Sequence, residues 1–449
     1  MLGMAAGKVL ERLRGSSTRA VLIRGAGGSF VVQVTGTGIG FAVQVCLARW
    51  LGRTGFGDYV VAIAWLNILV LLGKLGFDTS ALRFVAAYRS RGELGKLHGF
   101  LLRSHQIVLA GSLLLAVVAA GTVGLMAGRL RTALVMVLLV TWLMLPLNSL
   151  LEVTAACLRG LRRVVLAQAP VRILRPLLLL AGVGLLVAWR DAAPTAAQAM
   201  AVHLAAVIAS LALMFACLWI SLPEGTRGTP PEFDTGLWCR VAAPLLLLSG
   251  LYIVLGQTDL LMLGAMRGSA DAGVYGAAVR IAGLVGFGLV AVNMIAAPMI
   301  SELYARGQIK QLQHMVRMAA WAILAFAVPA TLGMMLGGKW ILALFGSEFV
   351  VGYTPLLVLL GGRLVNALSG SVGFMMSMTG HQRQAATIVG ISAVMNVVMN
   401  AALIPLAGGL GAAAATATTT VFSNLAMLIY VRRVLRINPT VLPMRASHP

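Results

Sequence analysis

Charge is scarce in this sequence of 449 residues: only 11% are Asp, Glu, Lys or Arg, and 59% are hydrophobic. A soluble domain carries about 25% charged residues, because its surface must be solvated by water. This chain has too few charges to cover a core in that way. The composition therefore excludes a soluble globular protein and indicates that lipid surrounds most of the molecule.

Acidic residues are scarcer still, with 13 Asp and Glu against 35 Lys and Arg, a net charge of +22. In a soluble protein such an excess would suggest nucleic acid. In membrane proteins, however, the cytoplasmic loops hold most of the Lys and Arg. With a cytoplasmic N-terminus, 23 of the 35 cations fall in predicted inside segments, 7 in outside segments and 5 within helices. This asymmetry predicts cytoplasmic termini and leaves no role for nucleic acid.

Cysteine is also rare: the four cysteines are dispersed and form no CxxC pair, which argues against a disulfide framework or a zinc site. The sequence has no Walker motif and no nucleophile with a base at catalytic spacing. We therefore predict no metal, no cofactor and no enzymatic activity.

Long apolar runs recur along the whole chain. About twenty apolar residues span the hydrocarbon core of a bilayer, and these runs are continuous rather than alternating, which favours helices over strands. They predict an all-α membrane protein of about twelve transmembrane helices at 27–48, 57–77, 105–127, 132–156, 165–189, 195–220, 241–265, 274–300, 318–338, 355–377, 385–406 and 409–431.

The predicted helices divide into two halves of six. A basic arm at 1–26 precedes the bundle 27–220, a linker with three prolines at 221–240 leads to the bundle 241–431, and a tail follows at 432–449. An even helix count gives both halves the same orientation, so the repeat is parallel, as in transporters with a substrate site between their repeats. Four pairs share an offset of 216 residues: Gly52/Gly268, Gly57/Gly273, Tyr59/Tyr275 and Tyr88/Tyr304.

A charge within a membrane helix costs about 2.5–3.5 kcal/mol, so each one needs an explanation. Gln168, Arg172 and Arg175 are spaced i, i+4 and i+7 and share one face of the helix 165–189. Arg175 lies roughly 15 Å from the inner end of that helix, near mid-membrane. Its guanidinium either binds a phosphate of the substrate as a bidentate fork or pairs with a neighbouring helix.

The remaining intramembrane charges also have two interpretations. Asp259 and Arg280 lie at similar depth on consecutive helices, which favours a salt bridge over a role for Asp259 in ion coupling. Glu152 is within reach of Lys74 or Arg172 and is expected to be a partner of one of them rather than a proton carrier.

Two further polar faces are candidates for substrate contact. Arg363 and Asn366 share a face of the helix 355–377, which carries no carboxylate. A polar stripe on the helix 27–48 either lines a sugar-binding cavity or packs closely against a neighbour, with Gly36 and Gly40 allowing the approach. The members of this stripe are Ser29, Gln33, Thr37, Gly40 and Gln44.

Three strings carry a family resemblance: LARWLGRTGFGDYVVAIAWLNILVLLGKLGFDTSALRFVA, TDLLMLGAMRGSADAGVYGAAVRI and NVVMNAALIPLAGGLGAAAATATTT. They resemble the polysaccharide-biosynthesis flippases, which move lipid-linked repeat units across the bacterial inner membrane and share a superfamily with multidrug and toxin antiporters. The resemblance implies a V-shaped pair of six-helix bundles around a central cavity, working by alternating access.

The resemblance implies a flippase for a polyprenyl-diphosphate-linked oligosaccharide that feeds O-antigen, capsule or exopolysaccharide synthesis. Arg175 and Arg363 would hold the diphosphate, membrane lipids would surround the protein, and the polysaccharide polymerase machinery would be a partner. The rival is a cation-coupled multidrug antiporter, which needs carboxylates in its cavity, whereas the deep helices here hold more Arg than acid. A glycan polymerase would need a larger outside loop than the longest one predicted, 339–354.

Overall fold

The computed structural model describes residues 18–189 and 192–441, and within these ranges every regular element is helical. Nine spans among the described residues are long and apolar enough to cross a membrane. The protein is therefore a multi-pass all-α membrane protein, as the sequence predicted. The main helices are α2 Thr18–Gly73, α3 Phe77–Arg91, α4 Leu94–Met126, α5 Thr132–Gly160, α6 Val164–Ala169, α7 Arg175–Trp189, α8 Ala196–Ser221, α9 Thr235–Arg267, α10 Ser269–Gly283, α11 Phe287–Ala305, α12 Ile309–Phe345, α13 Tyr353–Ser369, α14 Val372–Met378 and α15 Gln382–Tyr430.

Two of these helices are long enough to cross a membrane twice, since about twenty residues suffice for one crossing. The backbone of α2 leaves the helical region at Gly52, and that of α15 leaves it at Gly408. These two breaks lie at or near the predicted boundaries between the first and second helices and between the last two. The total of about twelve crossings stays a prediction.

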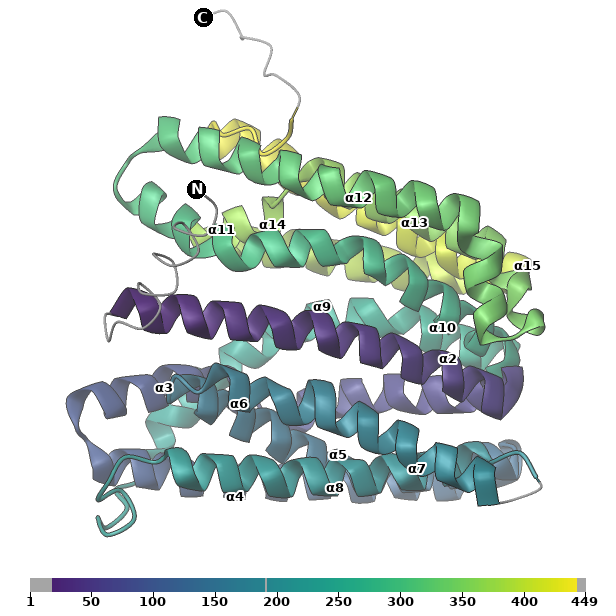
Figure 1. The fold of residues 1–449 in the computed structure, drawn as a ribbon, viewed down its shortest axis with the longest axis horizontal. Helices are drawn as coiled ribbons and strands as arrows, with labels where there is room; N and C mark the ends of the chain where they lie inside the picture. The colour runs from purple at the N-terminus through teal and green to yellow at the C-terminus, as the bar shows by residue number, and fades with distance from the viewer. Residues whose placement is uncertain (1–17, 190–191, 442–449) are drawn as a thin grey trace, which may run out of the picture. The chain divides into compact units, whose positions relative to one another are not determined.

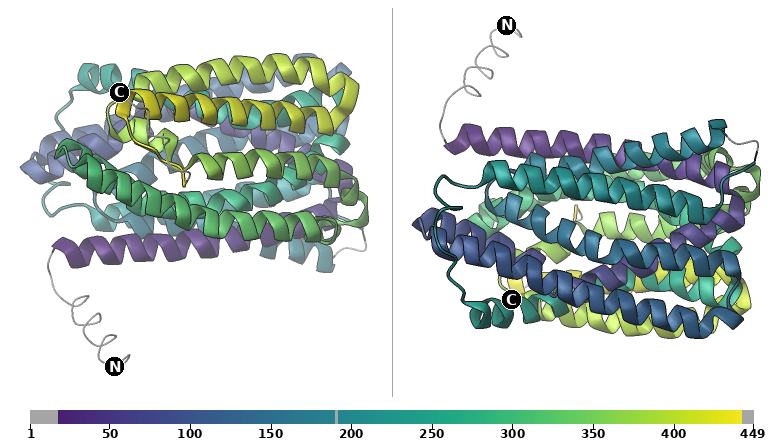
Figure 2. Two further views of the ribbon diagram at one scale, coloured as in Figure 1. Left: turned by 90° about the horizontal axis from the view of Figure 1, so that it is seen from above. Right: turned by 90° about the horizontal axis from the view of Figure 1, so that it is seen from below.

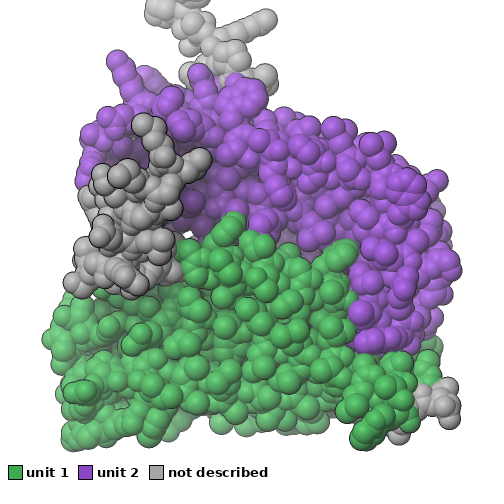
Figure 3. Space-filling view, in the orientation of Figure 1, with its two compact units in different colours: residues 1–43, 69–247 green, residues 44–68, 248–449 purple. Residues whose placement is uncertain are grey.

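Contacts between Cα atoms group the chain into two compact units, coloured separately in Figure 3. Unit 1 comprises Met1–Val43 and Leu69–Leu247, and unit 2 comprises Gln44–Ile68 and Leu248–Pro449. The segment Gln44–Ile68 belongs to the first repeat by sequence and yet packs with helices of the second. The predicted boundary between the halves at 221–240 stays a prediction.

Unit 1 is built around α5, which packs against α3, α4 and α8; the long helices α4, α5 and α8 run side by side in Figures 1 and 2. Aromatic rings fill one end of its core. The ring of Phe100 contacts that of Trp238 edge-on at 5.2 Å between centroids. The Trp238 indole N–H donates to the Tyr88 hydroxyl at 2.9 Å, so its buried polar atom is satisfied.

Unit 2 has its own core, in which α13 packs against α15 and α11 packs against α12. Ile300, Leu312 and Met375 are fully buried there. Large apolar side chains on the outer faces of both units remain exposed: Leu114 of α4 is 66% exposed and Leu336 of α12 is 82% exposed. In a membrane these faces contact lipid, which explains why the sequence can place them there.

Several segments differ from the predicted helix boundaries. Helix α2 already begins at Thr18, within the predicted arm 1–26, and α9 begins at Thr235, within the predicted linker 221–240. The connection expected near 78–104 is helical, formed by α3 and the first turns of α4. Hydropathy misses α3 because it is amphipathic: Phe84 and Tyr88 are buried while Arg89 and Arg91 are exposed. The expected outside loop 339–354 is shortened because α12 continues to Phe345. The predicted helix 355–377 is divided into α13 and α14 by Gly370, whose φ of 72° ends the first of them.

The parallel repeat is visible in the backbone. Gly52 (φ 66°, ψ 176°) and Gly268 (φ 92°, ψ 171°) adopt nearly the same conformation, one that residues other than glycine rarely adopt. The turn between α3 and α4 also matches the turn between α11 and α12, although the offset there is 215, so Tyr88 corresponds to Leu303 rather than Tyr304. The equivalent hydrogen bonds are Glu93 N to Tyr88 O and Gln308 N to Leu303 O, both 3.0 Å, and Leu94 N to Gly92 O and Ile309 N to Gly307 O, both 2.9 Å.

Within unit 2, equivalent segments of the two repeats cross each other. A Cβ placed on Gly57 would collide with the Ser269 carbonyl, and a Cβ placed on Gly273 would lie 2.5 Å from the Arg53 carbonyl oxygen. Since 53 and 269, like 57 and 273, differ by 216, the two contacts are related by a local two-fold symmetry, in which i contacts j and j contacts i. Only glycine permits the backbones of α2 and α10 to approach this closely.

Candidate functional site

The predicted arginine face of unit 1 is built from three consecutive helical pieces. Gln168 lies in the last turn of α6, Arg172 lies in a π-helical turn formed by Pro170–Leu174, and Arg175 begins α7. Pro170 lacks a backbone N–H, which weakens the regular ladder at this point. Single π turns inside α-helices occur frequently at functional sites, so the local backbone supports the choice of this face as a candidate.

This face packs against the polar stripe of α2. The Gln168 side-chain amide donates to the Ser29 hydroxyl at 2.9 Å. A Cβ on Gly36 would lie 2.8 Å from the Arg172 Cβ, so glycine allows the two helices to touch. Close packing therefore accounts for the part of the stripe between Ser29 and Gly36. Gln33 is only half-buried.

Side chains of α5 interact with both arginines. The Arg175 guanidinium donates through Nη1 to the Asn148 side-chain oxygen at 3.1 Å. Glu152, one helical turn further along α5, acts electrostatically on Arg172. Of the two partners predicted for Glu152, Lys74 pairs with Asp78 at 2.7 Å instead, and Arg172 is the one on which Glu152 acts electrostatically. Asn148 was missed by the sequence analysis, although its i, i+4 spacing from Glu152 was a usable signal.

Unit 2 contains a second polar cluster, centred on Asp259 of α9. The side chain of Asp259 is buried, and its Oδ2 accepts hydrogen bonds from the Tyr275 hydroxyl at 2.5 Å and the Thr416 hydroxyl at 3.1 Å. Arg363 of α13 lies near enough to act on this carboxylate electrostatically. Among the described ion pairs none joins Asp259 to Arg280. Depth along the helices suggested that pair, but depth does not fix the face on which a side chain lies.

The cluster extends along α15. The Asn400 side-chain amide donates to the Asn396 side-chain oxygen at 2.9 Å, and the Asn396 amide in turn approaches Thr416 and Thr419 at 3.5 and 3.4 Å. These α15 residues were not singled out as candidates from the sequence, although two asparagines at i and i+4 in an apolar helix are a signal.

The predicted candidates are thus divided between the two units. Gln168, Arg172, Arg175, Glu152 and Gln33 lie in unit 1, as does Lys74, which lies apart in its own ion pair. Asp259, Arg280, Arg363 and Asn366 lie in unit 2 with Gln44, whose side-chain oxygen is buried and has no hydrogen-bond partner among the described residues. No group of three or more His, Cys, Asp or Glu in the described part of the chain could hold a metal ion.

A family model described as a polysaccharide biosynthesis protein matches residues 22–304, more than half of the chain. The chain belongs to the polysaccharide biosynthesis protein family. A second model, MatE, matches residues 244–402, which include Asp259 and Arg363. The family predicted from the sequence is therefore confirmed.

Individual relatives are distant. A probable low-salt glycan biosynthesis flippase, Agl15 of Haloferax volcanii, is 25% identical over 160 residues, which cover 35% of this chain and 34% of that protein. The match thus spans about a third of the relative's length.

Solved structures share the fold of this polysaccharide biosynthesis protein. An inward-facing multidrug resistance transporter of the MATE family, within the MOP superfamily, has a TM-score of 0.70 at 14% identity and covers 90% of this chain and 97% of its own. The lipid II flippase MurJ, in an inward closed conformation, has a TM-score of 0.70 at 15% identity and covers 90% of this chain and 87% of its own.

Proposed function

We propose that this polysaccharide biosynthesis protein is a flippase that carries a polyprenyl-diphosphate-linked oligosaccharide across the bacterial inner membrane by alternating access. In this proposal the oligosaccharide feeds the synthesis of a surface polysaccharide such as O-antigen, capsule or exopolysaccharide. The family membership and the flippases among the relatives and structural neighbours support this class of substrate.

The arrangement of Arg172 and Arg175 carries the proposal. Guanidinium groups bind phosphate oxygens through paired N–H donors. Here the Asn148 side-chain oxygen orients the Arg175 guanidinium, and Glu152 acts electrostatically on that of Arg172. Two guanidinium groups three residues apart, at a depth where ions are costly, suit a diphosphate and disfavour a cationic substrate.

Asp259 is the coupling group in this proposal. A carboxylate buried in a membrane protein is costly unless it is neutralised or hydrogen-bonded. Two hydroxyl groups donate to Asp259, and binding of a proton or a monovalent cation would remove the remaining cost of its charge. Gain and loss of that cation would change the charge that acts on Arg363. This change would shift unit 2 between two conformations.

The alternative function is that of a cation-coupled multidrug antiporter, which the MatE match over 244–402 favours. Such a transporter must offer a carboxylate to its cationic substrate. Asp259 is only 5% exposed and already accepts two hydroxyl hydrogen bonds, so it is poorly placed for direct contact with a drug. We therefore prefer the flippase.

Deletion of the gene tests the proposed substrate. We expect lipid-linked oligosaccharide to accumulate on the cytoplasmic side and surface glycan to disappear. Complementation with the Arg175→Ala variant should fail at normal expression. Arg175→Lys should restore partial function, because lysine keeps the charge but cannot form two parallel hydrogen bonds to a phosphate. The matched control Leu177→Ala should complement fully, since Leu177 is an exposed neighbour on α7. Normal surface glycan in the deletion strain, with no trapped intermediate, contradicts the proposal.

A further inference from the structure

We propose that a hollow at one end of unit 1 binds the headgroup of a zwitterionic phospholipid, which carries a phosphate and a primary ammonium. The hollow has a volume of about 280 Å³ and lies between α3, the start of α4 and the start of α9, all of them in unit 1. The residues that line it lie within or directly after the segments 78–104 and 221–240. The distribution of cations predicts that both segments are cytoplasmic.

A pair of aromatic rings forms the apolar part of the hollow. The Phe84 and Tyr88 rings stack with their centroids 5.8 Å apart, and both line the hollow. Phe84 also contacts Phe100 at 5.5 Å between centroids, and the Tyr88 hydroxyl accepts the Trp238 indole N–H at 2.9 Å. Because these neighbours hold both rings in place, the hollow is already formed before a ligand enters, as is usual for small-molecule sites.

Three of the charged side chains that line the hollow form one group. The two carboxylate oxygens of Glu93 lie 3.8 Å from Arg91 Nη1 and 3.1 Å from Lys96 Nζ. The Glu93 side chain is 29% exposed and both cations are more exposed than that, so water and ligands can reach the group. One carboxylate faces two cations, and the group therefore retains a positive charge that can bind a phosphate.

The other two charged side chains of the hollow, Arg83 and Asp234, take part in no ion pair within residues 18–189 and 192–441. The Arg83 guanidinium lies over the Phe84 ring, 6.0 Å from its centroid. A cytoplasmic location accounts for an excess of cations, but it does not account for a carboxylate without a partner beside them. A cation and a carboxylate that do not pair with each other are complementary to a ligand that carries both charges.

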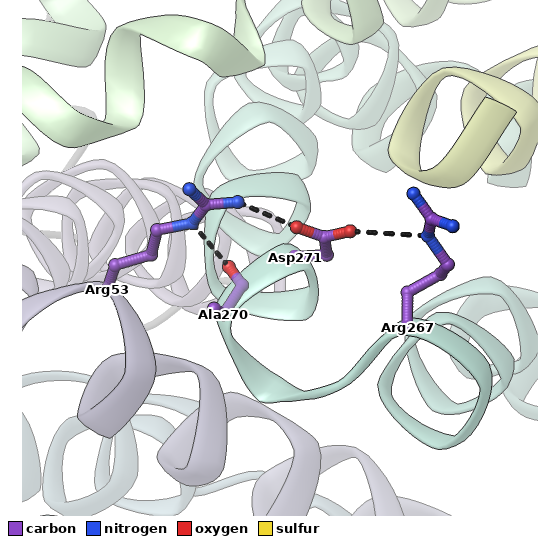
Figure 4. Close-up of polar contacts among 4 residues, drawn as sticks. All are labelled: Arg53, Arg267, Ala270 and Asp271. Atoms are coloured by element: carbon purple, nitrogen blue, oxygen red, sulfur yellow. Dashed lines mark hydrogen bonds and ion pairs between the residues drawn. The ribbon is translucent and has the colours of Figure 1, made fainter.

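A charge cluster of unit 2, drawn in Figure 4, shows the closed arrangement that the hollow lacks. Arg53 donates through Nη2 to Asp271 Oδ1 at 2.6 Å and through Nε to the Ala270 carbonyl at 3.2 Å. Arg267 lies 3.6 Å from the other oxygen of Asp271. Every charged group of that cluster has an oppositely charged partner in the protein, whereas two charged groups of the hollow have none among the described residues.

The polarity of the hollow changes along α9, which favours a lipid over a soluble ligand. Asp234, Leu237 and Val241 follow one another at i, i+3 and i+7 and share one face, on which Val241 lies about 10 Å beyond Asp234. Leu237 is 41% exposed beside the charged residues. A headgroup at Asp234 would direct its glycerol and acyl chains along Leu237 and Val241, toward the predicted membrane. Basic pockets on the cytoplasmic side of membrane proteins bind lipid headgroups, and here Asp234 selects one that carries an ammonium.

Binding of short-chain phospholipids to the full-length protein in detergent, measured by native mass spectrometry, tests the site. Dioctanoyl phosphatidylethanolamine should bind about 3- to 10-fold more tightly than the glycerol or the choline analogue. The glycerol headgroup has no cation, and the choline headgroup has no N–H to donate to Asp234. Asp234→Asn should remove this preference. The matched control Glu224→Gln, which changes an exposed carboxylate of the same connection outside the hollow, should keep it.

Arg83 tests the contact with the phosphate, which all three lipids share. Arg83→Gln should weaken the binding of each lipid about 3- to 10-fold. The control Arg163→Gln removes an exposed cation of unit 1 that does not line the hollow and should weaken none of them. Arg83 and Asp234 are both exposed, so neither substitution should prevent folding.

Soluble O-phosphoethanolamine distinguishes a lipid from a free phosphate ester. It has the headgroup without the chains, so it should displace the lipid only at concentrations at least about 30-fold higher. Equal potency of the two overturns the lipid as the occupant. Equal affinity for the three lipids, or a preference that survives Asp234→Asn, overturns the site. No lipid-linked oligosaccharide enters these measurements, so their outcome is independent of the proposed flippase substrate.

Discussion

Replacing Asn148 with leucine removes the acceptor of the hydrogen bond that Arg175 donates at 3.1 Å, and leaves the charge of Arg175 in place. A hydrogen bond to a charged group contributes about 1.5–3 kcal/mol. Arg175 is only half-buried, so the lower end of that range applies, and about 1.5 kcal/mol corresponds to about tenfold in an equilibrium or a rate. We therefore expect Asn148→Leu to reduce flipping of a labelled lipid-linked oligosaccharide in proteoliposomes about tenfold at limiting substrate.

A double-mutant cycle shows whether Asn148 acts through Arg175. In the Arg175→Ala background, Asn148→Leu should lower the flipping rate less than about twofold, because the group that Asn148 orients is gone. The control is Leu143→Ala on the exposed face of the same helix, which should leave the rate unchanged in both backgrounds. An equal tenfold loss with and without Arg175 would refute this reasoning and give Asn148 a role in packing.

Two further predictions concern coupling and helix packing. Asp259→Asn should abolish the dependence of transport on an imposed proton or sodium gradient, measured in proteoliposomes, whereas Tyr275→Phe should only weaken it; unchanged dependence in both variants would exclude this cluster from coupling. Gly36→Ala should destabilise the protein by about 1–3 kcal/mol in thermal unfolding, since the added Cβ meets Arg172 at 2.8 Å. Gly40→Ala, with nothing within 4 Å, is the control and should not lower the melting temperature.

The membrane fold could be predicted from the sequence because continuous apolar runs and the asymmetry of the cations both follow from the physics of the bilayer. The repeat was also recoverable, since Gly52 and Gly268 are required by a backbone conformation that other residues rarely adopt. Hydropathy could not find α3, because an amphipathic helix such as Phe77–Arg91 has no long apolar run.

The candidate site was predictable only in part. Spacing along one helix identified the face of Arg172 and Arg175. In the structure Asn148 accepts a hydrogen bond from Arg175, and Glu152 acts electrostatically on Arg172. The partners of Asp259 could not be derived in the same way, because pairing across helices depends on their rotation as well as on depth. Tyr275 and Thr416 reach Asp259 through that rotation, which hydropathy does not encode.

The contact between Val60 and Gly276, which differ by 216 residues, also bears on the history of the chain. A residue that touches its own repeat equivalent makes the contact that a two-fold homodimer of a half-length protein would make on its symmetry axis. In such a dimer one substitution would alter both sides at once. In the fused chain each side can change alone. Arg53 and its repeat equivalent Ser269 are a position where the two copies now differ.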